Sequence, residues 1–152
     1  MISIGGENLI DLVSGAAAAN GLPQYVANPG GSPFNVAMAS GRQGQKVAYL
    51  TPVSEDALGA LLAERLVESK VTLAAGRVPH PTSLAVVSIT DGIPSYAFHR
   101  NGTAERQVTK QALHMTCRRK QSCSMSDPSA SSTVTTPMHG RRSLPIAVVA
   151  ES

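Results

Sequence analysis

A double glycine directly before a helix start is the feature that most restricts how this chain folds. Gly30 and Gly31 precede Ser32, a good N-cap residue, and Pro33, which suits the first helical position because its missing N–H would be unbonded there. Glycines let a ligand approach the main chain closely, and a helix N-terminus offers free N–H groups. Gly30-Gly31 is therefore either a plain turn or one side of a small-molecule site.

Three polar side chains have both a structural and a functional interpretation. Asn35, in the first turn of the expected helix, either caps that helix or bonds ligand hydroxyl groups, since an amide both donates and accepts. Asp11 lies within the apolar stretch 9–13. A buried carboxylate without partners is costly, so Asp11 either faces solvent or accepts hydrogen bonds from a polyol. Arg100 is either an ordinary surface charge or a contact for an anionic or hydroxylated ligand.

Alternating strand and helix patterns predict an α/β fold. One helix begins at Ser32 and stops at Gly44, and a second opens at 54–56, where acidic residues favour a helix N-terminus. Apolar residues at helical spacing mark the core-facing side of each helix: Phe34, Ala37, Met38 and Gly41, then Leu58, Leu61, Leu62 and Leu66. Short apolar runs predict strands at 2–5, 9–13, 24–27, 46–50 and 71–74. This order favours parallel strands with helices packed on them.

The pattern changes to a hairpin after Thr82. Residues 83–89 and 95–99 read as strands around Asp91-Gly92, an Asp-Gly turn signal. Asn101-Gly102 is a second turn signal. A hairpin added to an α/β unit often becomes a lid over a site, so we expect this role for it.

The composition changes near Leu113. Residues 1–113 hold eight Lys or Arg and eight Asp or Glu, whereas 114–152 hold five and two, so the second stretch carries the whole net charge of +3. After Leu113 no helical or alternating period is present, apart from an apolar run at 146–150 that could form a strand. We therefore expect one domain over 1–113 and a disordered or frameshifted tail over 114–152.

Several classes of function are disfavoured. No apolar run approaches the roughly 20 residues that span a bilayer, and the start lacks the basic n-region of a secretory signal. We therefore expect a cytoplasmic protein with no membrane partner. Cys117 and Cys123 fit no zinc-ligand spacing, so we expect no metal site. The basic cluster Arg118-Arg119-Lys120 has no aromatic residues around it, so we expect no nucleic-acid partner.

Three segments, taken in order, resemble one family. Residues 30–37 (Gly-Gly-Ser-Pro-Phe-Asn-Val-Ala), followed by 53–59 (Val-Ser-Glu-Asp-Ala-Leu-Gly), look like the first signature of the ribokinase/PfkB family of carbohydrate kinases. Residues 6–12 resemble the first strand of bacterial fructokinases, and 98–106 resemble their lid-side segment. The resemblance implies a ribokinase-like (Rossmann-like) α/β fold, a parallel sheet with helices and a small β lid. It implies that the lid is formed by 9–13, 24–27 and 83–99.

The resemblance also implies a reaction, the ATP-dependent transfer of phosphate to a sugar hydroxyl. It implies that Asp11 accepts hydrogen bonds from the sugar, that Gly30, Gly31 and Asn35 close around the same sugar, and that Arg100 is a weaker candidate for sugar contact. It further implies ATP and Mg as cofactors and a homodimer that forms through the lid strands.

The resemblance also exposes a gap. Members of this family carry their nucleotide and catalytic residues late in the chain, in a Gly-Ala-Gly-Asp motif, and residues 107–152 contain no such motif. No catalytic residue is therefore assigned, and we expect a catalytically incomplete, truncated fragment whose sheet has an uncovered edge. The alternative is a non-catalytic sugar-binding or dimerising module that uses the same residues.

Overall fold

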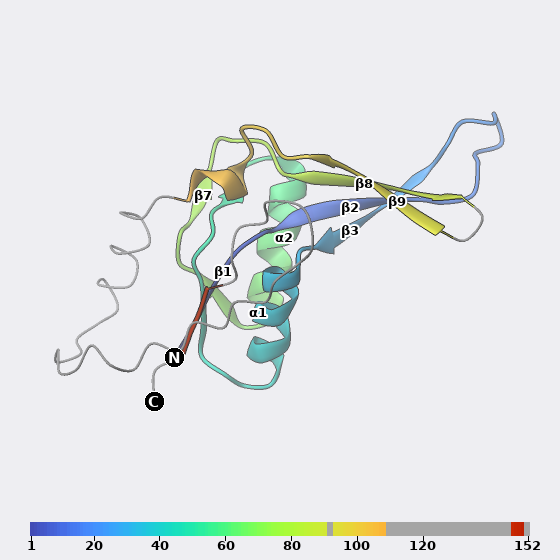
Figure 1. Cartoon of the computed structure of the whole chain (residues 1–152). Helices are drawn as coiled ribbons and strands as arrows, with labels where there is room; N and C mark the ends of the chain where they lie inside the picture. Colours follow the sequence, from blue (N-terminus) through green and yellow to red (C-terminus); the bar gives the residue numbers. More distant parts are fainter. Residues whose placement is uncertain (91–92, 109–146, 151–152) are drawn as a thin grey trace, which may run out of the picture.

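The computed structural model describes residues 1–90, 93–108 and 147–150. Figure 1 shows a helix-bearing body and a long, narrow sheet that extends away from it. The described residues thus form two units with different shapes, a helix-bearing body and a lid.

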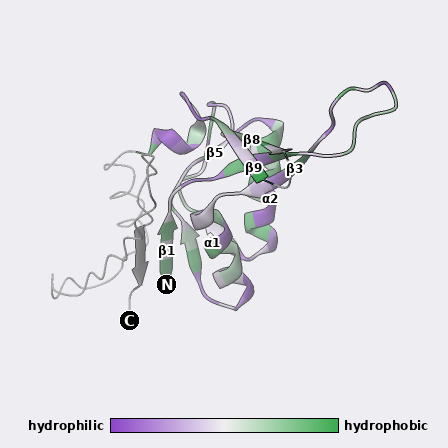
Figure 2. Cartoon of the chain, turned by 45° about the vertical axis from the view of Figure 1, so that its right-hand side comes forward, coloured by the Kyte–Doolittle hydropathy of each residue, from purple (hydrophilic) through white to green (hydrophobic). Residues whose placement is uncertain are grey.

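The body is built on the predicted parallel strands. Strands β1 (Ile2–Gly5), β4 (Val47–Tyr49) and β6 (Val71–Leu73) lie side by side in the order β1-β4-β6 and are parallel. Helices α1 (Ser32–Arg42) and α2 (Ala57–Glu68) connect them. Both crossovers move in the same direction across the sheet, so right-handed connections place both helices on one face, as Figure 2 shows. The predicted α/β fold is confirmed.

The lid is a separate four-stranded sheet in the order β3-β2-β8-β9. Its strands are β2 (Leu9–Ser14), β3 (Tyr25–Gly30), β8 (Leu84–Thr90) and β9 (Ile93–His99). Strands β2 and β8 are parallel, and the two outer strands run antiparallel to their neighbours. The three segments expected to form the lid therefore do so, and the predicted hairpin is confirmed by the pairing of β8 with β9. Its turn, Asp91-Gly92, lies outside the described residues.

Two small elements join the body to the lid. Strands β5 (Val53–Ser54) and β7 (Arg77–Val78) form a two-stranded parallel sheet, and the short helix η1 (Ala104–Gln107) follows the lid. Asp56, the N-cap of α2, accepts a hydrogen bond from Gly59 N, and it also accepts two from the main chain and hydroxyl of Thr82. Asp56 thus ties the start of α2 to the segment that leads into the lid, in addition to the expected role at the helix start.

A single apolar core joins both helices to the body sheet. The T-shaped pair Phe34 and Tyr49, with ring centroids 6.1 Å apart, lies between α1 and β4. Leu62 and Leu66 are fully buried, and Leu58 and Leu61 pack against them from the edge of the predicted stripe. The core consists of Ile4, Ile10, Phe34, Ala37, Val47, Tyr49, Val53, Leu62, Leu66 and Val71. Helical spacing therefore identified the buried faces correctly.

The N-cap of α1 differs from the sequence-based expectation. Gly31, with φ 108°, is the N-cap, Ser32 is already helical, and no side chain caps the helix. The main chain turns at positive φ to leave β3, and only glycine adopts that conformation without strain. Asn35 N then donates to Gly31 O. The expected Ser32 cap is wrong by one residue because the turn at Gly31 starts the helix earlier.

The free edge of β1 is covered by the end of the chain. Strand β10 (Ala147–Ala150) pairs antiparallel with β1, from Ile2 opposite Ala150 to Gly5 opposite Ala147. The expected strand at 146–150 is confirmed. Within the described residues the sheet ends at β10 and β6, and the expectation of an uncovered edge stays a prediction. Residues 109–146, with Cys117, Cys123 and the basic cluster 118–120, lie outside the described residues.

No helix within residues 1–90, 93–108 and 147–150 is long and apolar enough to cross a membrane. The cytoplasmic location stays a prediction.

Candidate functional site

Gly31 lies directly against the loop that joins β1 to β2, and Gly30 lies against β2. A Cβ on Gly31 would lie 2.5 Å from the carbonyl oxygen of Glu7, and a Cβ on Gly30 would overlap the Asp11 carboxylate. Side chains at these positions would therefore push α1 away from the loop and from Asp11. The close approach that demands glycine is to the protein's own chain, and it brings the start of α1 next to Asp11.

Asp11 lies on β2, in the lid, and is half-buried. Burial, and secondly the negative charge of Glu7, raise the pKa of the Asp11 carboxyl above its ordinary value. No described residue donates a hydrogen bond to this carboxylate. Asp11 is thus a partly dehydrated carboxylate with free acceptor capacity, located beside Gly30.

Asn35 is exposed in the first turn of α1. Its amide side chain forms no hydrogen bond within the described part of the chain, so it is not a helix cap. Gly31 and Asn35 are joined by the first hydrogen bond of the helix, between Gly31 O and Asn35 N at 2.9 Å. The structure therefore brings Asp11, Gly30, Gly31 and the base of Asn35 to one end of α1.

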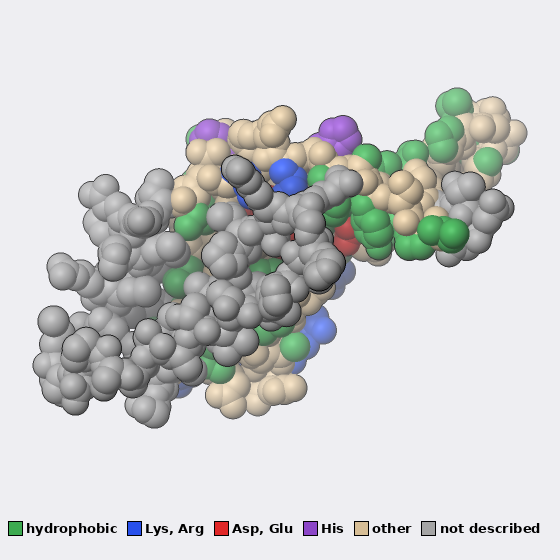
Figure 3. Space-filling model, viewed as in Figure 1, with side chains coloured by type: hydrophobic (Ala, Val, Ile, Leu, Met, Phe, Trp, Pro, Cys, Tyr) green, Lys and Arg blue, Asp and Glu red, His purple; other side chains and the backbone are tan. Residues whose placement is uncertain are grey.

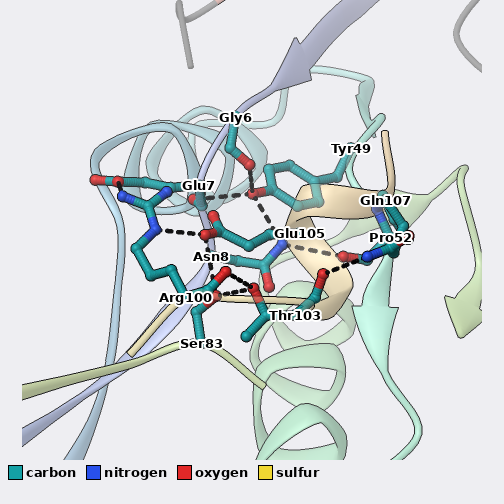
Figure 4. Close-up of polar contacts among 10 residues, drawn as sticks. All are labelled: Gly6, Glu7, Asn8, Tyr49, Pro52, Ser83, Arg100, Thr103, Glu105 and Gln107. Carbon is teal, nitrogen blue, oxygen red and sulfur yellow. Dashed lines mark hydrogen bonds and ion pairs between the residues drawn. The ribbon is translucent and has the colours of Figure 1, made fainter. Parts of the chain in front are cut away.

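Arg100, at the end of β9, is the centre of an ion-pair cluster (Figure 4). Its Nε donates to Glu105 Oε1 at 2.6 Å, and its Nη1 lies 3.0 Å from Glu7 Oε2. Burial alone would lower the pKa of Arg100, but the two carboxylates raise it above its ordinary value. Since Glu7 is also the residue that Gly31 packs against, the Arg100 cluster is continuous with the glycine turn.

Glu105 is the fully buried member of this cluster. Its Oε1 lies 3.0 Å from Ser83 Oγ, which is also 2.7 Å from Thr103 Oγ1. Glu105 Oε2 and Arg100 Nη2 are both buried without a hydrogen-bond partner in the part of the chain that the structure describes. Sequence reasoning did not single out Glu7 or Glu105, although both fall within segments that carried the family resemblance.

A second set of hydrogen bonds fixes the loop that carries Glu7. Tyr49 Oη lies 3.0 Å from Gly6 O and 3.1 Å from Glu7 O, and burial raises the pKa of this phenol. Asn8 Nδ2 donates to Pro52 O at 3.2 Å, and Gly6 N donates to Thr51 Oγ1 at 2.8 Å. The body sheet therefore determines where the Glu7 carboxylate meets Arg100.

The described residues offer no preformed metal centre. Within residues 1–90, 93–108 and 147–150, no three His, Cys, Asp or Glu side chains are grouped so that they could hold a metal ion. The acidic residues near Arg100 are thus assigned no metal-binding role.

The sequence of this chain matches the model of one protein family. The model of the pfkB family carbohydrate kinases matches residues 3–137. The chain belongs to this family. The match to the family model ends at residue 137, beyond Leu113. The domain boundary expected at Leu113 therefore stays a prediction.

Fructokinases are among the relatives of this pfkB family chain. It is 36% identical over 114 residues to a fructokinase of Rhizobium leguminosarum bv. trifolii, covering 74% of this chain and 35% of the relative. It is 34% identical over 118 residues to fructokinase-1 of Oryza sativa subsp. japonica, covering 72% and 36%. The chain therefore spans about a third of the length of the curated relatives it matches.

Solved fructokinase structures share the fold of the described residues. The fructokinase of Xylella fastidiosa superposes with a TM-score of 0.66 and 27% identity, covering 72% of this chain and 36% of that one. A second structure of the Xylella enzyme, with bound ATP, gives a TM-score of 0.65. The ribokinase-like fold expected from the sequence is confirmed.

Proposed function

We propose that the described residues form the sugar-binding part of an ATP-dependent kinase that phosphorylates fructose or a similar sugar. The observation that carries the proposal is the Asp11 carboxylate, half-buried beside Gly30 and free to accept hydrogen bonds. A polyol offers the hydroxyl donors that such a carboxylate lacks. Membership of the pfkB family and the fructokinase relatives support the choice of sugar.

Each residue at this end of α1 has a distinct part in the proposal. Asp11 accepts hydrogen bonds from two sugar hydroxyls, and the exposed amide of Asn35 donates to or accepts from another. Gly30 and Gly31 keep the start of α1 close enough for both side chains to reach one ligand. Arg100, whose Nε and Nη1 are already paired, orders the wall of the site and is not a free sugar contact.

ATP and Mg belong to the proposed reaction but not to the described residues. ATP would supply the phosphate, and a divalent ion would neutralise its charge during transfer. The described residues do not fit the ion, and the 152-residue sequence lacks the Gly-Ala-Gly-Asp motif. We therefore propose that this chain binds the sugar and does not by itself transfer phosphate.

Titration calorimetry with D-fructose tests the binding step. We expect the parent chain to bind, Asp11→Asn to weaken binding by at least about tenfold because charged hydrogen bonds are lost, and Glu64→Gln on the exposed face of α2 to bind like the parent. A parent that binds no fructose, or an Asp11→Asn variant that binds it normally, would refute the sugar site. ADP release on mixing the chain with ATP and fructose would refute the proposed incompleteness.

A second role, dimerisation, is favoured by the outer strands of the lid. Tyr96 and Phe98 stack with ring centroids 6.0 Å apart and are exposed, as is Ile93 on the same strand. Tyr25 and Val26 are exposed on the opposite edge strand, β3. Figure 3 shows hydrophobic side chains along much of the lid. We propose that a second copy of the chain covers this surface.

Analytical ultracentrifugation tests the dimer. We expect a concentration-dependent dimer for the parent and a monomer for Tyr96→Ser/Phe98→Ser. The matched control is Val67→Ser, which removes an exposed apolar side chain from α2 and should leave the dimer intact. A monomeric parent would contradict the proposal.

A further inference from the structure

The cluster around Arg100 contains more carboxylates than guanidinium groups. Arg100 contacts Glu7 and Glu105, and the charge of Glu7 also reaches Asp11 strongly enough to raise the pKa of its carboxyl. Two carboxylates therefore contact one guanidinium, and together with Asp11, which interacts with Glu7, the four residues carry a formal charge of −2. The site end of the lid is acidic even though it contains an arginine.

The guanidinium has no free edge for an anionic ligand. A carboxylate or phosphate binds arginine best through two parallel N–H groups. In this structure Nε is engaged by Glu105 and Nη1 by Glu7, while Nη2 is buried. A bidentate ligand would bind either the Nε and Nη2 groups or the Nη1 and Nη2 groups of Arg100. One nitrogen of each pair is already engaged by a carboxylate, so neither pair offers the bidentate geometry that an acidic sugar requires.

Glu7 and Glu105 contribute differently to the charge and the position of the Arg100 cluster. Glu105 is fully buried, accepts a hydrogen bond from Nε and lies near Ser83, so it positions the guanidinium. Glu7 is partly exposed, with 26% of its side chain accessible, and adds a negative charge next to Asp11. A bound anion would face repulsion from Glu7 and Asp11 in a partly dehydrated environment, where charges are weakly screened.

We infer that Glu7 and Glu105 determine acceptor specificity: by occupying Arg100 they make the site accept an uncharged polyol and reject anionic sugars such as sugar acids. The inference rests on the proposed sugar site and names residues that set its substrate class. Glu105 acts through Arg100 and is a positioning residue, and Glu7 acts through its own charge as well. Asp11 favours the same ligands, since it accepts hydrogen bonds that hydroxyl groups can donate and an ionised carboxylate cannot.

Two ligands with the same carbon skeleton, of which only one is charged, test this inference. D-Fructose and D-fructuronate differ at one carbon, a hydroxymethyl group in the first and a carboxylate in the second. Calorimetry on the full chain should show that the parent binds fructose at least about tenfold more tightly than fructuronate, as expected for one uncompensated like-charge contact. Glu7→Gln, which removes one carboxylate charge and frees Nη1, should reduce this preference about fivefold or more.

Controls separate specificity from folding. Glu105→Gln keeps a side chain of the same shape and should also reduce the preference, whereas Glu64→Gln makes the same charge change on the exposed face of α2 and should leave it unchanged. The ratio of the two affinities is the readout, because a variant that is merely less stable loses both ligands together.

The outcomes distinguish this inference from the function on which it rests. If the parent binds fructose and fructuronate equally, or if Glu7→Gln leaves the ratio unchanged while fructose still binds, the inference is overturned and the sugar site stands. If the parent binds neither ligand, the sugar site itself is refuted and the inference with it.

Discussion

Replacing Gly31 by alanine tests the central packing of the site. Gly31 has φ 108°, and a Cβ there would lie 2.5 Å from Glu7 O and 3.3 Å from Asn8 Cα. A non-glycine residue at such a φ costs about 1–3 kcal/mol. Relieving the overlap with a main-chain oxygen requires α1 or the loop to shift, at about 1–3 kcal/mol more. Gly31→Ala should therefore lower the free energy of unfolding by about 2–6 kcal/mol in total.

Gly44 provides the matched control for this substitution. It also has a positive φ, 85°, but a Cβ there would meet nothing within 4 Å. Gly44→Ala should thus lower the free energy of unfolding only by the cost of the backbone conformation, about 1–2 kcal/mol. The difference between the two variants isolates the steric approach of α1 to the Glu7 loop from the strain of the backbone.

Urea unfolding followed by circular dichroism measures both variants. We expect a lower midpoint for each, with an unchanged m-value, and a larger shift for Gly31→Ala by at least about 1 kcal/mol. Fructose binding should weaken in Gly31→Ala at a urea concentration where it is still folded, because the shift displaces Glu7 and Asp11. Equal losses of stability in the two variants would refute the packing argument.

Three further substitutions test separate parts of the structure. Asp56→Ala should lower the free energy of unfolding by about 2 kcal/mol, because the cap and the hydrogen bonds to Thr82 are lost. Hydrogen bonds from Thr82 and Gly59 outweigh burial and lower the pKa of Asp56 to about 2, so the extra stability of the parent should be present above pH 4 and disappear as pH falls toward 2. A stability difference that is the same at both ends of an acid titration would contradict this. Asp11→Asn should unfold at the same or a slightly higher urea concentration than the parent at pH 7. Burial and Glu7 raise the pKa of Asp11, so its charge opposes folding above that pKa. A clear loss of stability would show that Asp11 is structural. Tyr49→Phe should lower the free energy of unfolding in urea by about 1–2 kcal/mol, because Gly6 O and Glu7 O lose a buried donor. An unchanged free energy of unfolding would mean that these oxygens find other partners.

The order of elements could be predicted from the sequence because it depends on local patterns. The apolar spacing along 57–68 identified the buried face of α2, with Leu62 and Leu66 at its centre. The Asp-Gly pair at 91–92 identified the β8–β9 hairpin from chemistry that acts within a few residues. Such signals do not require knowledge of the rest of the molecule.

The charge cluster could not be predicted because its members are distant in sequence. The pairing of β2, β8 and β9 brings Glu7 and Arg100 together, and no sequence pattern near either residue predicts their contact. Glu105 is five residues from Arg100, but its complete burial depends on Ser83 and the packing of η1. Arg100 by itself therefore suggested an anion contact, whereas in the fold its charge is already compensated.

The cap of α1 was missed for a related reason. Ser32 has the side chain of a good N-cap, and local propensity favours it there. The tertiary approach of Gly31 to Glu7 sets the main-chain direction instead, so the helix starts where the packing allows. A local preference worth about 1 kcal/mol yields to a contact that would otherwise be a steric overlap.

The pairing of β10 with β1 joins residues that are far apart in the sequence. Ile2 lies opposite Ala150, 148 residues further along, whereas it lies opposite Val47 of β4 after only 45 residues. The longer loop costs more conformational entropy to close, so we expect the β1–β10 pairing to form later in folding than the β1–β4 pairing. Until β10 docks, one edge of β1 has unpaired main-chain groups that strands of other molecules can bind.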